Sequence, residues 1–208
     1  MARPLHIGLD LDNTIVDYDQ AFGEVGVSTG ILSAGHGMPG KAQIKDHLLS
    51  QSGGMETWMR LQGQVYGPFM QAAVPFDGSI SFIRGMLECG NKVTIISHKT
   101  KFGHFDETRT SLWDAARSWL GANGIVANTP GGLFDQDVIF SETREEKIGQ
   151  IVKAGCDIFI DDLLEVLQHP DFPETVRRIW FVGRAESIST AGLRAFPNWG
   201  EISAALTG

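Results

Sequence analysis

The sequence predicts an α/β fold built on a doubly wound parallel sheet, with a small helical insertion after the first strand. Five short runs rich in Ile, Val and Phe are apolar on both faces, as is typical of parallel strands covered by helices on each side; they lie at residues 5–11, 92–97, 137–141, 157–161 and 178–182. Helical patterns alternate with these runs at residues 79–88, 108–120, 144–154 and 163–168, and a last helix is expected at 199–206. This alternation indicates an open sheet with helices on both faces.

The insertion is predicted from the distance between the first two strands. About eighty residues separate them, and a single crossover needs far fewer. Apolar side chains recur there at steps of three and four, a pattern more typical of a packed core than of a cofactor site, at Trp58, Leu61, Val65, Phe69 and Ala72. The first half is expected to be loose because of its glycines, Gly23, Gly26, Gly30, Gly35, Gly37 and Gly40. We therefore expect a core domain at residues 1–19 and 76–208 and a helical insertion at residues 20–75.

Composition excludes several classes of partner. The 208 residues carry a formal net charge of −8, with no basic cluster, so neither nucleic acid nor a membrane surface is an expected partner. A small anionic substrate is compatible, since a site can be locally positive. No apolar run reaches the roughly 18 residues of a membrane span and no signal peptide precedes the first strand, so a cytoplasmic location is expected. Cys89 and Cys156 form no CxxC pair and predict neither a disulfide framework nor a zinc site. Nothing in the sequence specifies an oligomeric state.

Polar residues follow the carboxyl ends of four predicted strands, which is where ligands bind in open α/β sheets. The first strand ends in Asp10, Leu11, Asp12, Asn13 and Thr14, and the second in Ser97, His98 and Lys99. The turn after the third strand leads into a helix that bears Lys147, and the fourth strand ends in Asp161 and Asp162. Four distant segments therefore bring carboxylates, a hydroxyl group and an ammonium group to one edge.

Crowded carboxylates repel one another unless a cation neutralises them. Oxygen ligands without His or Cys select a hard ion, and Mg²⁺ is the usual one beside phosphate. A turn at residues 11–13 would let Asp10 and Asp12 face the same ligand, so that one attacks phosphorus and the other handles protons. Ser97 can donate to a phosphoryl oxygen, and Lys147 can neutralise the phosphoryl group and the nucleophile. The segment Thr143–Glu146 fits a capping box, which would fix where the helix of Lys147 begins.

Four segments resemble the motifs of the haloacid dehalogenase (HAD) superfamily. IGLDLDNTIVD is similar to the first motif, DxDxT after an apolar strand, and VTIIS to the second, a strand that ends in Ser or Thr. Lys147 before an apolar helix resembles the third motif, and FIDDLLE resembles the fourth in its Asp-Asp form. The motifs follow in the family's order across residues 5–165, and the first is the most specific of them.

The resemblance implies a Rossmann-like core, a C1-type cap at residues 20–75, and a Mg²⁺-dependent phosphatase. It implies an aspartyl-phosphate on Asp10, and Asp12 as the acid that protonates the leaving group and then activates water. The metal would be held by Asp10, the backbone carbonyl of Asp12, and Asp161, with Asp162 helping directly or through water. The phosphate-binding candidates are Asn13, Ser97, His98 and Lys147. Asp12 separates the chain from the dehalogenases, which lack that acid, and the DKTGT motif of the family's transport ATPases is absent.

Three functions stay open at this point. The first is a phosphomonoesterase that acts on a small phosphorylated metabolite. The second is a 5'-nucleotidase or deoxynucleotidase-like phosphatase, for which Trp58 and Tyr66 are the candidates to stack a base. The third is a non-catalytic phospho-ligand-binding protein, which would not need Asp12. Lys101 and Lys153 are rivals of Lys147. Residues that could contact the rest of a substrate, or be ordinary solvated residues, are Lys41, Arg60, His98, Lys99, Lys101, His104 and Arg144.

Overall fold

The structure, a computed structural model, describes residues 3–35, 40–105, 109–129, 131–183 and 192–207. Gly37 and Thr108, to which the sequence assigned a loose segment and a helix start, lie outside these residues. The chain forms two compact units. Unit 1 comprises Met1–Val16, Pro75–Lys99 and Gly121–Gly208, and unit 2 comprises Asp17–Val74 and Thr100–Leu120. Unit 2 thus contains the predicted insertion together with residues 100–120, which the sequence prediction had placed in the core domain.

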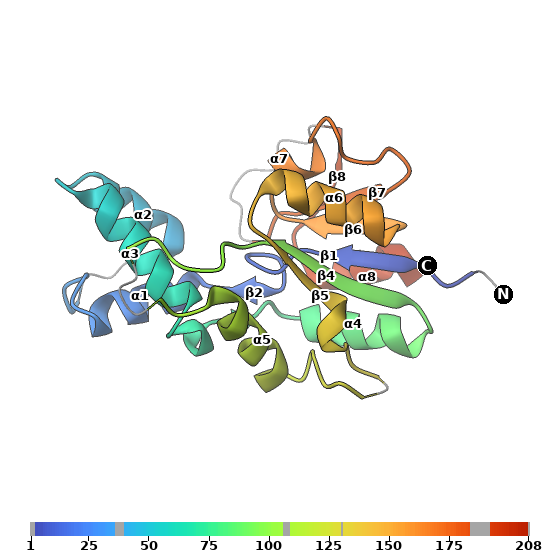
Figure 1. The fold of residues 1–208 in the computed structure, drawn as a ribbon, viewed down its shortest axis with the longest axis horizontal. Helices are drawn as coiled ribbons and strands as arrows, with labels where there is room; N and C mark the ends of the chain where they lie inside the picture. Colours follow the sequence, from blue (N-terminus) through green and yellow to red (C-terminus); the bar gives the residue numbers. More distant parts are fainter. Residues whose placement is uncertain (1–2, 36–39, 106–108, 130, 184–191, 208) are drawn as a thin grey trace. The chain divides into compact units, whose positions relative to one another are not determined.

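Unit 1 is built on a parallel six-stranded sheet with the order β5-β4-β1-β6-β7-β8 (Figure 1). The strands are β1 (His6–Leu9), β4 (Lys92–His98), β5 (Val138–Ser141), β6 (Ile158–Asp161), β7 (Arg177–Phe181) and β8 (Arg194–Phe196). The first five confirm the predicted strands. The sixth was not predicted, because its three residues form no apolar run. β1 lies between β4 and β6, where the chain's direction of travel across the sheet reverses, and such a switch point is where a ligand crevice forms.

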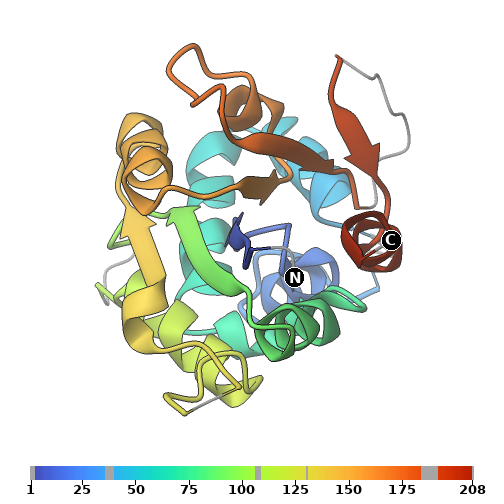
Figure 2. The same cartoon turned by 90° about the vertical axis from the view of Figure 1, so that its right-hand side faces the viewer.

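Helices cover both faces of this sheet (Figures 1 and 2). On one face, α6 (Arg144–Ala154) and α7 (Leu164–Leu167) pack in one hydrophobic cluster with Phe159 and Trp180. On the other face, α4 (Ser79–Glu88) and α8 (Trp199–Thr207) pack together, and the ring of Trp199 lies 5.4 Å from that of Phe181 between centroids. Trp180 and Phe181 are neighbours on β7, so their side chains point to opposite faces. Burial on both faces explains why the strands read as continuous apolar runs.

Unit 2 is helical, as predicted for the insertion. Its helices are α1 (Asp19–Ser28), α2 (Lys41–Leu49), α3 (Gly54–Tyr66), the short 3₁₀ helix η1 (Met70–Ala72) and most of α5 (Leu112–Ala122). The short strands β2 (Val16–Asp17) and β3 (Val74–Pro75) form a two-stranded sheet where the chain passes between units. Trp119 on α5 donates a hydrogen bond from Nε1 to the carbonyl oxygen of Ala73 at 2.9 Å, which ties residues 100–120 to the insertion.

Two details of the predicted insertion were wrong. The apolar stripe holds only as far as α3, where Trp58, Leu61 and Val65 are buried, whereas Phe69 lies beyond the helix end and is 41% exposed. The glycine-rich first half is not loose over its whole length, since α1 runs through Gly26. A Cβ atom at Gly26 would lie 2.6 Å from a methyl carbon of Leu32, so a glycine there permits close packing of the following segment.

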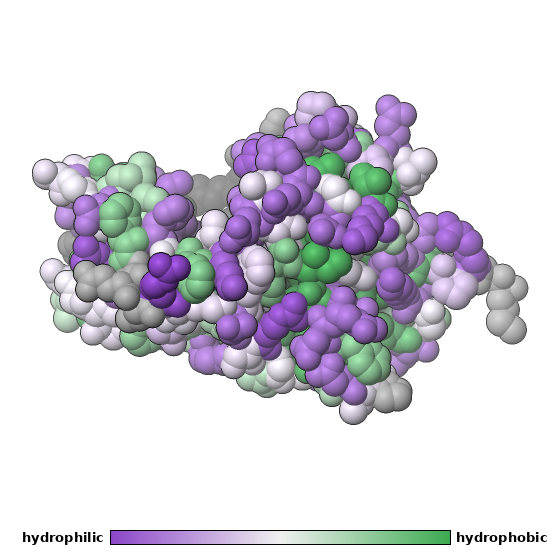
Figure 3. Space-filling model, in the orientation of Figure 1, coloured by the Kyte–Doolittle hydropathy of each residue, from purple (hydrophilic) through white to green (hydrophobic). Residues whose placement is uncertain are grey.

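The face of the molecule in Figure 3 is mainly hydrophilic, and its hydrophobic side chains form small separate areas. Within the described ranges, no helix combines the length and the apolar character that a membrane span requires.

Candidate active site

The centre of the site is a buried lysine between two buried carboxylates. Lys147 Nζ lies 2.6 Å from Asp10 Oδ1 and 2.6 Å from Asp161 Oδ2. All three side chains are at most 6% exposed. These residues come from three segments that the sequence analysis expected at one edge, and the structure brings them into direct contact. Lys153, one predicted rival of Lys147, is exposed in the last turn of α6.

Regular secondary structure holds each member of this centre. Asp10 directly follows β1, and its backbone N–H donates to the carbonyl oxygen of Ile160 on β6 at 2.9 Å, which fixes it beside Asp161. Lys147 sits in the first turns of α6, whose start has the predicted capping box. The Thr143 hydroxyl accepts from the Glu146 N–H at 3.1 Å, and the Glu146 carboxylate accepts from the Thr143 N–H. The capping box thus fixes where α6 begins, and with it the position from which the Lys147 side chain extends.

The predicted turn after Asp10 is present. The carbonyl oxygen of Leu11 accepts the N–H of Ile15 at 2.9 Å, and the N–H of Asn13 donates to the carbonyl oxygen of Val16 at 2.9 Å. Asn13 has a φ of 58°, in the left-handed region that Asn tolerates better than most residues. The left-handed backbone conformation of this turn therefore favours Asn at position 13. Thr14 is buried and its hydroxyl donates to Asp162 Oδ1 at 3.3 Å, which joins this turn to the end of β6.

Asp12 forms an ion pair with Lys99, which the sequence analysis placed at the end of the second strand only as a candidate contact to the rest of a substrate. Lys99 Nζ lies 2.8 Å from Asp12 Oδ2, and the Lys99 side chain is 2% exposed. The signal was present in strand periodicity. Alternate residues of a strand face the same side, so a site that uses Ser97 also receives Lys99, whereas His98 points to the opposite side. The sequence interpretation instead treated Lys99 as one of several residues that could contact the rest of a substrate or be ordinary solvated residues.

Ser97 and His98 differ in exposure, as expected for neighbouring residues of a strand, whose side chains point to opposite sides. Ser97 Oγ is buried, and among the described residues no hydrogen-bond partner for it exists. A buried hydroxyl without a partner is costly, and an oxygen of a bound phosphate would satisfy it. His98 is exposed, and its Nε2 contacts the backbone carbonyl oxygen of Glu142 at 3.0 Å. The structure therefore does not bring His98 together with Ser97, contrary to the predicted phosphate-binding set.

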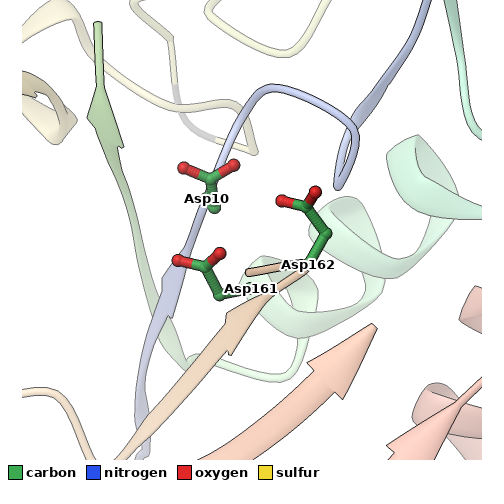
Figure 4. Close-up of side chains that lie close together, drawn as sticks. All are labelled: Asp10, Asp161 and Asp162. Atoms are coloured by element: carbon green, nitrogen blue, oxygen red, sulfur yellow. The ribbon is translucent and has the colours of Figure 1, made fainter. Parts of the chain in front are cut away.

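Three carboxylates converge beside Lys147 in a way that suits a cation. One oxygen from each of Asp10, Asp161 and Asp162 lies within 4.8 Å of the other two, and their side chains converge from the ends of β1 and β6 (Figure 4). The set contains only oxygen donors, so its chemistry fits a hard cation. Lys147 and Lys99 carry two positive charges against the four carboxylates of Asp10, Asp12, Asp161 and Asp162, and a divalent cation would balance the rest.

The charges of the site alter its pKa values. Burial raises the pKa of Asp10 to about 7, with Asp161 and Asp12 adding to the rise and Lys147 opposing it. Burial lowers the pKa of Lys147, but the carboxylates of Asp10 and Asp161 outweigh burial and raise it above its ordinary value. Lys147 therefore stays protonated at neutral pH, while Asp10 needs further positive charge to be a full carboxylate.

No protein-family model and no curated protein matches the sequence. Solved structures do match along nearly the whole chain. The HAD-hydrolase YfnB of Bacillus subtilis, in a form bound to magnesium, has a TM-score of 0.60 at 12% identity, over 100% of both chains. A predicted phosphatase from Clostridium acetobutylicum has a TM-score of 0.59 at 11% identity, over 99% of both chains. A HAD family hydrolase from Deinococcus radiodurans with bound phosphate and sodium has a TM-score of 0.56 at 12% identity, over 98% of this chain and 95% of that one.

The chain has the HAD fold. The motif residues that suggested this fold occupy consistent places in it, since Asp10 and Asp161 end the neighbouring strands β1 and β6 and Ser97 lies near the end of β4. The assignment of the insertion as a C1-type cap stays a prediction.

The remaining candidates are described by their own contacts. In unit 2, Lys41 Nζ lies 5.4 Å from the centroid of the Phe22 ring, and Arg60 pairs with Glu56 at 2.9 Å on the surface. Lys101 Nζ lies 5.8 Å from the ring centroid of Trp113. His104 and Tyr66 line a cavity of about 150 Å³ within unit 2. Arg144 is the first residue of α6.

Proposed function

We propose that this protein is a Mg²⁺-dependent phosphomonoesterase that acts on a small phosphorylated metabolite through an aspartyl-phosphate on Asp10. The observation that carries the proposal is the buried cluster of Asp10, Lys147 and Asp161, with two contacts of 2.6 Å at the carboxyl edge of a HAD-fold sheet. Burying this much charge is expensive, and a fold that needed only stability would do as well with apolar residues. A site that binds and transfers a phosphoryl group supplies a reason to keep it.

The metal would be held by Asp10, Asp161 and Asp162, with the backbone carbonyl of Asp12 as a further ligand. The oxygen donors of the three side chains are already close enough for one ion. Bound Mg²⁺ would supply positive charge to the phosphoryl oxygens and to the Asp10 carboxylate. Lys147 adds a fixed positive charge next to the nucleophile, and Ser97 Oγ would donate to a phosphoryl oxygen.

The first half-reaction transfers the phosphoryl group to the protein. A carboxylate oxygen of Asp10 attacks phosphorus, the bond between phosphorus and the ester oxygen breaks, and the Asp12 carboxyl gives its proton to that oxygen. The alcohol then leaves.

The second half-reaction regenerates the protein. Water attacks phosphorus of the aspartyl-phosphate, and the Asp12 carboxylate accepts the proton that the water loses. The bond to Asp10 breaks, and inorganic phosphate leaves. Asp12 is again a carboxylic acid and Asp10 again a carboxylate, so the cycle is closed.

The structure offers no support for the nucleotidase alternative through Trp58. This side chain is 4% exposed, and it stacks on Phe22 with ring centroids 5.0 Å apart. The Trp58 ring is therefore packed inside unit 2. Tyr66 makes a T-shaped contact with Tyr18, at 4.7 Å between ring centroids, and lines the cavity of about 150 Å³ in unit 2.

Phosphate release from p-nitrophenyl phosphate tests the proposal, with Mg²⁺, with EDTA, and with the Asp10→Asn variant. Turnover should require Mg²⁺ and should fall by about 10³-fold or more in the variant, because an amide is a far poorer nucleophile. Mg²⁺-dependent phosphate binding without turnover would instead indicate the non-catalytic phospho-ligand-binding protein. A panel of sugar phosphates and nucleotides, measured under the same conditions, then decides the substrate class.

A further inference from the structure

We propose that Lys99 is a positioning residue that holds the Asp12 carboxylate where both of its proton transfers take place. This inference rests on the proposed function, in which Asp12 serves as acid and then as base. Lys99 is not part of the motif residues that suggested that function. It enters through the ion pair of Lys99 Nζ with Asp12 Oδ2, at 2.8 Å.

The burial of Lys99 makes its position specific. A lysine side chain is normally exposed, yet only 2% of this one is accessible, while that of Asp12 is 18% accessible. A buried ammonium group is stable only next to a negative partner, and Asp12 Oδ2 is such a partner. The pair therefore links a deeply buried cation to the more accessible acid, which is the one that must meet a substrate.

The backbone of Lys99 is fixed as well. Its N–H donates to the carbonyl oxygen of Ser141 at 2.9 Å, which continues the pairing of β4 with β5 one residue beyond His98. Ser97 on β4 and Lys99, one residue past its end, are two positions apart and both buried, with the Ser97 hydroxyl placed for a phosphoryl oxygen and the Lys99 ammonium placed for Asp12. Two neighbouring groups of one rigid strand set the distance between the phosphoryl site and the proton donor.

Asp12 needs such a support, because its backbone forms only an isolated bridge with Val16 at the start of a tight turn and belongs to no strand. The turn continues into Asn13, whose φ is 58°. A carboxylate on this turn can adopt several rotamers, and proton transfer requires an approach of about 2.6 to 3.2 Å to the reacting oxygen. A contact to one of the two carboxylate oxygens restricts this rotation. Lys147 cannot supply the restriction, since it is committed to Asp10 and Asp161.

A double-mutant cycle with Lys99→Met and Asp12→Asn tests the inference, with Lys99→Arg as the conservative variant. Lys153→Met is the matched control, because Lys153 is an exposed lysine in the last turn of α6. The substrate is p-nitrophenyl phosphate with saturating Mg²⁺, since its leaving group needs little protonation and keeps the Asp12→Asn rate measurable. Circular dichroism of each variant confirms that it is folded.

Lys99→Met should lower kcat by about 100-fold, within the range that positioned acid–base groups contribute, with KM changed by less than threefold. In the Asp12→Asn background the same substitution should have almost no further effect, because the group that Lys99 positions is already lost. Lys99→Arg should recover part of kcat, and Lys153→Met should behave as the unchanged protein. If Lys99→Met does not fold, Lys99→Arg replaces it in the cycle. As a single variant it should still lower kcat, and in the Asp12→Asn background it should cause no further loss of kcat.

Three results would overturn the inference. An unchanged kcat in Lys99→Met would do so, and so would a rise in KM alone, which would make Lys99 a phosphate-binding residue. If Lys99→Met lowers kcat by the same factor in the unsubstituted protein and in the Asp12→Asn variant, Lys99 has a role that is independent of Asp12. If the unsubstituted protein hydrolyses no phosphate ester, the proposed function fails together with the inference. If the protein is active but kcat does not change when Lys99 is substituted, only the inference is overturned.

Discussion

Lys147 and its two carboxylate partners show how a single side chain can serve stability and chemistry together. The ammonium group lies 2.6 Å from an oxygen of Asp10 and from one of Asp161, and no part of this triad is well hydrated. Without the lysine, two buried carboxylates would face each other across a low-dielectric space. We therefore expect Lys147 to be required for the folded state as well as for phosphoryl transfer.

Lys147→Met should lower the free energy of unfolding in EDTA by about 3 kcal/mol or more, which is the usual cost of removing one partner of a buried ion pair. Saturating Mg²⁺ should recover part of that loss, because the ion also neutralises carboxylates. Urea denaturation with EDTA and with Mg²⁺ measures both effects, and Lys153→Met is the control for a lysine in water. Equal stabilities of the two variants in EDTA would contradict this view of the triad.

Asp157 gives a separate prediction about pH. Its carboxylate accepts hydrogen bonds from the Arg3 guanidinium and from the backbone N–H of His6, the latter at 2.8 Å, and these bonds hold the pKa of Asp157 below its usual range. A lowered pKa in the folded state means that the stabilisation is present above the unfolded pKa of about 3.9 and is lost as pH falls further. Arg3 is the larger cause of the lowered pKa, but its side chain is 74% exposed and hydrated, so we assign most of the gain in stability to the bond from the backbone N–H of His6.

Asp157→Asn should therefore cost about 1 kcal/mol at pH 7, because the amide keeps one acceptor oxygen but loses the negative charge and the second acceptor. The difference from the unsubstituted protein should shrink as pH falls below about 4. Urea denaturation at pH 7 and at pH 3 provides the comparison, with Asp171→Asn as the control because Asp171 is 85% exposed. A difference that is the same at both pH values would show that the charge of Asp157 has no part in it.

Most side chains of the candidate site followed from the sequence because they end strands. Asp10, Ser97 and Asp161 could be placed at one edge by strand order alone. Lys99 was also expected at this edge, but its ion pair with Asp12 could not be predicted, because it joins side chains of two segments that meet only in the folded sheet. His98 was predicted in the phosphate-binding set, and the structure places it at an exposed position on the strand, where neighbouring side chains alternate in direction.

The N-terminal end of α6 positions the side chain of Lys147. In its capping box, the Thr143 hydroxyl accepts from the N–H of Glu146, and the Glu146 carboxylate accepts from the N–H groups of Glu142 and Thr143 just before the helix. Thr143→Ala should cost about 1 kcal/mol in unfolding free energy, the usual loss for a helix N-cap. It should also lower kcat, because the turn that carries Lys147 becomes less fixed. Val152→Ala, at an exposed position of the same helix, should change neither quantity.

Elements with a long apolar pattern were predicted well, and short or closely packed ones were not. The bounds of α4 and α6 match the predicted ranges, since both helices have clear caps or glycines at their ends. β8 has only three residues and gains its partner from β7, a tertiary contact that no local pattern contains. α1 continues through two glycines because Leu32 packs over Gly26, which again depends on a residue outside the helix.

The sheet as a whole explains why the acidic residues gather. β1 and β6 run parallel side by side, so Asp10 and Asp161 reach the same edge although 151 positions of sequence separate them. The resulting cluster should bind Mg²⁺ and be stabilised by it. At Mg²⁺ concentrations 100 times the dissociation constant, the gain is about 2.7 kcal/mol. For a chain of this size, that gain corresponds to roughly 5 to 10 °C in Tm.

Differential scanning calorimetry with and without Mg²⁺ measures this gain. Asp162→Asn should reduce the shift, because one oxygen donor of the cluster becomes a weaker amide ligand, and the exposed Asp171→Asn should leave it unchanged. A shift of the same size in Asp162→Asn and in the unsubstituted protein would place the metal elsewhere.

The nucleophilic role of Asp10 is the centre of this account, and trapping the phosphorylated residue tests it most directly. Asp12→Asn should slow hydrolysis of the intermediate while an activated ester such as p-nitrophenyl phosphate still forms it. Acid quench, borohydride reduction and mass spectrometry of the peptide around position 10 then convert an aspartyl-phosphate into homoserine and locate it. We predict homoserine at position 10, dependent on both Mg²⁺ and substrate. Hydrolysis of the ester with no modification at position 10, or with homoserine at another aspartate, would contradict the account.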